Sequence, residues 1–85
     1  MNSVIKKLIG EITELAVDAT NKTKHDVFAD YHGHVSGFHV NYHANGYSTG
    51  TPETNIIDIY MDREKNQISK LKQAKRKLKK LLEEK

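Results

Sequence analysis

Apolar residues near the start of the chain recur at steps of three and four. The stripe consists of Val4, Ile5, Leu8, Ile9, Ile12, Leu15 and Ala16. This spacing places them on one face of a helix, which we expect over residues 3–20. The run Thr20-Asn21-Lys22-Thr23, made of poor helix formers, is expected to end it.

Residues 25–32 and 35–43 read as two antiparallel strands around a turn at Gly33-His34. A two-residue turn pairs His32 with Val35. This register segregates apolar from polar side chains, and a slip of one residue would destroy the segregation. The polar face then takes Asp26, Phe28, Asp30, His32, Gly37, His39, Asn41 and His43.

A surface loop with a turn at Asn45-Gly46 leads to a third expected strand, residues 55–61. Its inward side chains are Ile57, Ile59 and Met61, while Asp58 and Tyr60 join the polar face.

A final helix is expected over residues 62–83, with Asp62 as its N-cap. Its apolar positions are Ile68, Leu71, Ala74, Leu78, Leu81 and Leu82. At about 30 Å it would be as long as the domain is wide, so we expect its C-terminal half to protrude or to pack on a partner.

These elements predict one α+β domain over residues 1–85, in the order α-β-β-β-α, with two helices on the apolar face of a three-stranded antiparallel sheet. So small a core often needs a disulfide, a metal ion or oligomerisation, and a homodimer is one such solution. Because the chain has no cysteine, disulfides and thiolate zinc sites are excluded.

The net charge of +3 is unevenly distributed. Residues 62–85 hold ten Lys or Arg against four acids, a net charge of +6, which leaves −3 on residues 1–61. The positive charge therefore belongs to the final helix rather than to the whole domain.

All five histidines fall between positions 25 and 43. In an extended strand Asp30, His32 and His34 point to one side, and His39 approaches from the paired strand. These carboxylate and imidazole groups predict a structural zinc site, although the same ligands would also bind nickel, copper or cobalt. Asp58 would then hold an imidazole tautomer from outside the ligand set. The alternative is a set of ordinary histidines on a half-exposed hairpin.

His25 is expected on the opposite face or at the frayed start of its strand, and His43 too far along to join the same ion.

No nucleophile elbow or Gly-rich phosphate loop surrounds the serines, so we expect a protein that is not an enzyme. Glu11 and Glu14 interrupt the first apolar stretch, which argues against a signal peptide. No apolar run reaches membrane-spanning length. We therefore expect a cytoplasmic protein that does not bind membranes.

Three interpretations of the basic helix remain open: a solvated face, a phosphate-binding surface, or a docking surface for an acidic protein. The candidate partner-binding residues are Lys72, Lys75, Arg76 and Lys79 of the helix and Tyr60 and Asn41 of the polar face.

The element order and the string Ser69-Lys70…Ala74-Lys75 resemble the double-stranded RNA-binding domain, which implies a nucleic-acid-binding module that reads A-form shape. In that family the lysines begin the helix, whereas here they follow the expected start by about two turns. The loop between the first two strands is also shorter than that family's minor-groove loop.

The small, lysine-rich, cysteine-free chain as a whole resembles phage-encoded type II anti-CRISPR proteins, which bind Cas9. This resemblance rests on overall character, because no diagnostic motif is present. It implies a protein that binds a host defence nuclease stoichiometrically and occludes nucleic-acid loading. Since the chain is net basic, blocking a lobe or the path of target DNA is expected rather than DNA mimicry.

Overall fold

The computed structural model describes residues 3–33, 36–44, 52–60 and 65–83. Its elements follow the expected order, which confirms the α+β class. They are α1 (Ser3–Lys22), β1 (Asp26–His32), β2 (Gly37–His43), β3 (Thr54–Tyr60) and α2 (Gln67–Glu83).

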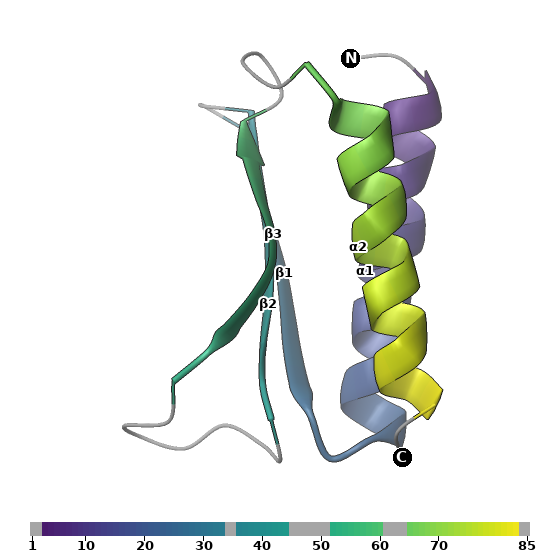
Figure 1. Ribbon diagram of the computed structural model, residues 1–85, viewed down its shortest axis with the longest axis vertical. Helices are drawn as coiled ribbons and strands as arrows, with labels where there is room; N and C mark the ends of the chain where they lie inside the picture. The colour runs from purple at the N-terminus through teal and green to yellow at the C-terminus, as the bar shows by residue number, and fades with distance from the viewer. Residues whose placement is uncertain (1–2, 34–35, 45–51, 61–64, 84–85) are drawn as a thin grey trace.

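The strands form one antiparallel sheet in the order β1-β2-β3. Both helices lie on the same face of this sheet, side by side and running in the same direction (Figure 1). Neither helix covers the opposite face, which is called the open face below (Figure 1). The two helices, one from each end of the chain, therefore form one layer, and the three strands form the other.

The core lies between the two layers, where the predicted apolar stripes meet. Its most deeply buried members include Ile12 of α1, Phe38 and Val40 of β2, and Leu71 and Leu78 of α2. Ile57 and Ile59 of β3 point inward as expected, whereas Met61 lies outside the described residues. Burial of this apolar surface is the main stabilising contribution to the fold.

The predicted pairing of β1 with β2 is wrong by two residues. His32 pairs with Gly37, not with Val35, and the connection spans residues 33–36. Ser36 in this connection donates its N–H to the Gly33 carbonyl oxygen at 3.3 Å and adopts a φ of 50°. A shift of two residues keeps every side chain on its expected face, so the apolar pattern does not distinguish the two registers.

A β-bulge in β3 adds a core residue that simple alternation does not predict. Val40 pairs with Ile57, but Asn41 pairs with Asn55, so Ile56 is the extra residue between these pairs. Because the bulge resets the alternation, both Ile56 and Ile57 are buried.

Helix α1 continues two residues beyond its predicted end. Thr23 then donates both its backbone N–H, at 3.0 Å, and its hydroxyl, at 2.6 Å, to the Ala19 carbonyl oxygen. Thr23 therefore supplies hydrogen bonds to a carbonyl group of the last turn. It lies just after the helix and caps it.

Helix α2 starts later and packs more completely than expected. Lys65 and Asn66 lie in a turn before Gln67, and the predicted cap Asp62 lies outside the described residues. The expectation of a protruding C-terminal half is wrong, because Leu78 and Leu81 in that half are buried against the core. The shorter helix of about 25 Å fits alongside α1. Within the described ranges, neither helix combines the length and apolar character required to cross a membrane.

Candidate functional site

His39 lies at the centre of the open face, in the middle strand. Asp30 pairs with it from β1, and Asp58 pairs with it from β3. The sequence pattern predicts His39 diagonal to Asp30, and the two-residue change of register places them directly opposite instead. The next row toward the hairpin end of the sheet is His32, Gly37 and Tyr60.

Three side chains contact the imidazole of His39. Its Nδ1 pairs with the Asp58 carboxylate. The ring centroid lies 5.2 Å from that of His32 and 5.7 Å from that of Tyr60, both in edge-to-face geometry. The carboxylate fixes the orientation of the imidazole, as the sequence pattern predicts for Asp58.

The zinc prediction involves four residues, of which His34 lies outside the described residues. The other three, Asp30, His32 and His39, all lie on the open face. Among the residues that the structure describes, no three His, Asp or Glu side chains are grouped closely enough to hold a metal ion. The zinc site therefore stays a prediction.

The remaining two histidines contact other rings. His25 lies before β1 and contacts Tyr42, with ring centroids 5.4 Å apart. His43 is buried and contacts Phe28 at 5.8 Å. Neither takes part in the contacts of His39 described above.

Helix α2 carries the second candidate surface. Its exposed cationic residues are Lys70, Lys72, Arg76, Lys77, Lys79 and Lys80. Leu71, Ala74 and Leu78 of the same helix are buried in the core. The helix that carries these cations is therefore held in place by packing. Lys70 and Lys80 lie about 15 Å apart along the helix axis.

The side of α2 that faces α1 is partly neutralised by acids. Lys75 is half-buried, and its Nζ lies 3.0 Å from Oε2 of Glu11. Both residues line a hollow between α1 and α2, and Lys79, Glu14 and Asp18 line it as well. Of the predicted contact residues, Lys72, Arg76 and Lys79 are exposed, and Lys75 and Lys79 lie beside carboxylates of α1.

The hydrogen bond from Lys75 is the largest influence on Glu11. It lowers the pKa of the Glu11 carboxyl below the ordinary value of 4.5, although desolvation opposes the change. The positive charges of Lys75, Lys7 and Lys79 lower the pKa further. Glu11 therefore keeps its charge to a more acid pH than a glutamate with the ordinary pKa.

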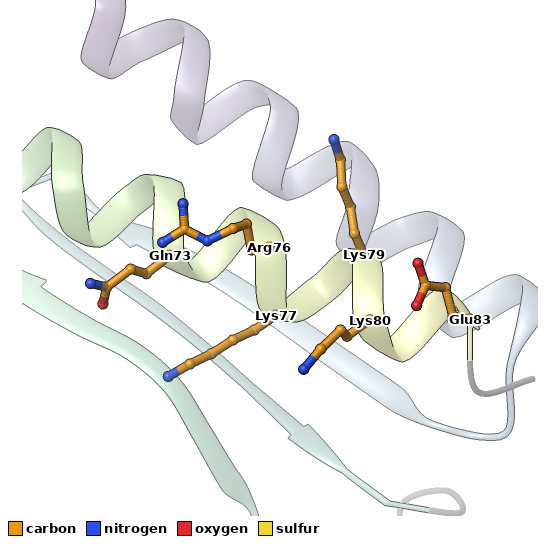
Figure 2. Close-up of a pocket in the computed structure, with 6 residues that line it drawn as sticks. All are labelled: Gln73, Arg76, Lys77, Lys79, Lys80 and Glu83. Carbon is orange, nitrogen blue, oxygen red and sulfur yellow. The ribbon is translucent and has the colours of Figure 1, made fainter.

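The cations on the sheet side of α2 are not among the contact residues predicted from the sequence. Lys70 and Lys77 line a groove of about 250 Å³ between α2 and β3. Lys77 and Lys80 also border a shallow hollow of about 520 Å³ on α2 (Figure 2). In Figure 2 they extend away from the side on which Lys79 projects. A helical wheel centred on Leu78 would have separated the two sides.

The two predicted contact residues of the sheet differ in exposure. Tyr60 is 40% exposed on β3, and Asn41 is half-buried on β2. Both lie on the open face, so the structure separates them from the cations of α2, which belong to the other layer (Figure 1).

Comparison of the chain with protein-family models, curated proteins and solved structures finds no match.

Proposed function

We propose that the protein is a non-catalytic module that binds the phosphate backbone of duplex nucleic acid through α2. The contact surface is the basic flank, defined as Lys70, Arg76, Lys77 and Lys80. The proposal rests on one observation: α2 carries these exposed cations while its apolar residues are buried in the core. Binding would release counterions from the duplex and would therefore depend strongly on salt.

The start of α2 supports this proposal over a merely solvated helix. The sequence pattern places the first lysines two turns into the helix, unlike the double-stranded RNA-binding domain. Because α2 begins at Gln67, Lys70 falls in its first turn and Lys72 follows in the second. That departure from the family pattern therefore disappears, and both helices lie on one face of the sheet (Figure 1).

The test is fluorescence anisotropy with labelled duplex RNA, duplex DNA and single-stranded RNA between about 50 and 200 mM salt, a range in which phosphate-driven binding changes strongly. We expect the duplexes to bind, with log affinity falling linearly against log salt. Reversing charge with Lys77→Glu and Lys80→Glu should make the slope for duplex DNA shallower by about 0.9 for each phosphate that the variant no longer neutralises.

A matched control reverses two exposed lysines outside α2, with Lys6→Glu and Lys24→Glu. This control has the same net charge as the test variant, so overall charge alone would affect both equally. An equal weakening of binding in the two variants, or no duplex binding at the lowest salt, would contradict the proposal.

A second candidate is a stoichiometric inhibitor of a Cas9-type defence nuclease, which the anti-CRISPR resemblance implies. The charge separation of the fold favours it, because the three strands contain three aspartates and no Lys or Arg. The open face therefore offers a protein a surface that repels nucleic acid. Target cleavage by several purified Cas9 orthologues, titrated with this protein, tests the candidate, and uninhibited cleavage throughout would reject it.

A further inference from the structure

Two adjacent rows of side chains cross the three strands on the open face. The first is His32, Gly37 and Tyr60, and the second is Asp30, His39 and Asp58. Tyr60 is 40% exposed, and the Asp58 side chain is 53% exposed. The rows therefore place aromatic rings beside accessible carboxylates.

Gly37 allows the rings to close over the middle strand. A Cβ atom at this position would lie 3.2 Å from Nε2 of His39 and 3.2 Å from Cδ1 and Cε1 of Tyr60. Any larger residue would push these rings apart. The rings of His39 and Tyr60 are thus packed on backbone, and the Asp58 carboxylate fixes the imidazole from its other side.

The charge of this surface is negative. Asp26, Asp30 and Asp58 all lie on the open face, and no strand contributes a lysine or arginine. The cations of the two helices belong to the other layer; of these, Lys70 and Lys77 line a groove that Asp58 also lines, whereas Asp30 lies on the opposite edge strand, β1. A group that binds here therefore gains most if it is positively charged.

We propose that the open face binds an arginine-bearing segment of a partner protein, with a guanidinium seated against Tyr60 and paired with Asp58 or Asp30. A planar guanidinium stacks on an aromatic ring and forms paired hydrogen bonds with a carboxylate, which an ammonium group does less well. Exposed rings also stack nucleic-acid bases, but the neighbouring aspartates would repel the phosphates. This inference rests on neither proposed function of the preceding section.

The probe is a capped glycine–serine peptide that carries two arginines, titrated into isotope-labelled protein and followed by NMR. Comparison peptides replace both arginines with lysine or with uncharged citrulline. We expect shifts of the His39, Asp58 and Tyr60 signals, with the arginine peptide binding tighter than the citrulline peptide by about tenfold or more.

Tyr60→Leu should weaken arginine-peptide binding by about tenfold. The control is Tyr31→Leu, which removes an aromatic ring of similar exposure, 47%, from the helix-facing side of β1. Asp58→Asn, which preserves shape, should also weaken binding. Circular dichroism is used to confirm that each variant is folded. The Tyr60 and Asp58 variants test the proposal independently, one through the ring and one through the carboxylate.

Equal binding of the arginine and citrulline peptides would overturn the proposal. So would an equal weakening of binding in the Tyr60 and Tyr31 variants. Shifts of the same signals by duplex RNA would assign the face to nucleic acid instead, and concentration-dependent shifts without peptide would assign it to a second copy of the chain.

Discussion

The Thr20 hydroxyl joins α1 to the edge of the sheet by bonding both backbone groups of Val27. Thr20 Oγ1 accepts a hydrogen bond from the Val27 N–H at 3.0 Å and donates to the Val27 carbonyl oxygen at 3.3 Å. Because β1 is an edge strand, these groups have no neighbouring strand on that side. The Thr20 side chain thus supplies the hydrogen bonds that a neighbouring strand would otherwise make with Val27.

Thr20→Val should destabilise the fold while preserving side-chain shape. Both Val27 groups would lose their partner in a partly buried setting, so we expect the free energy of unfolding to fall by about 1–3 kcal/mol. Urea denaturation measures it. Thr13→Val is the control, because the exposed Thr13 hydroxyl donates only to Ile9 within the helix, and its effect should stay within about 0.5 kcal/mol. Equal effects would contradict the role given to Thr20.

This contact also shows where sequence reasoning reaches its limit. Low helix propensity marks Thr20 as a helix-ending residue, whereas it lies inside α1 and bonds to β1. Propensity describes a residue within its own segment, and a partner seven positions away can override it. The apolar stripes were predictable because burial acts on every residue of a helix or strand face.

The open face was predicted in part for a related reason. Alternation correctly assigned His32, His39 and Asp58 to one face, since that depends only on odd and even positions. It did not fix which residues lie opposite, because the four-residue connection ending at Ser36 has no strong turn signal. The Asp30–His39–Asp58 row therefore required the structure.

Leu78→Ala should destabilise the protein strongly. Leu78 is fully buried on α2, in the half of the helix that was expected to protrude. Removing its side chain leaves a cavity between the layers, so we expect a decrease of about 2–5 kcal/mol in the free energy of unfolding. Lys80→Ala, at an exposed position of the same helix, should change stability by less than about 0.5 kcal/mol. A small effect at Leu78 would show that this half of α2 is loosely packed.

The Lys75–Glu11 ion pair should make stability depend on acid pH. Because Lys75 lowers the Glu11 pKa in the folded state, the contribution is present above the ordinary value of 4.5 and disappears as pH falls through the lower folded value. Urea denaturation of the native protein and of Glu11→Gln should differ at pH about 7 and converge near pH about 2. Glu14→Gln, at an exposed position of α1, is the control. A difference that persists unchanged in acid would contradict the ion pair as its cause.

Metal analysis decides the zinc prediction at the histidine hairpin. If the imidazoles of His32 and His39 hold zinc with His34 and Asp30, protein purified without a histidine tag should contain near-stoichiometric metal. A chelator should then lower the midpoint of thermal unfolding, because metal bound only by the folded state stabilises it. His39→Gln should lose the metal, while His25→Gln, whose ring contacts Tyr42 instead, should retain it. Zinc-free protein that does not take up added zinc would contradict the zinc prediction.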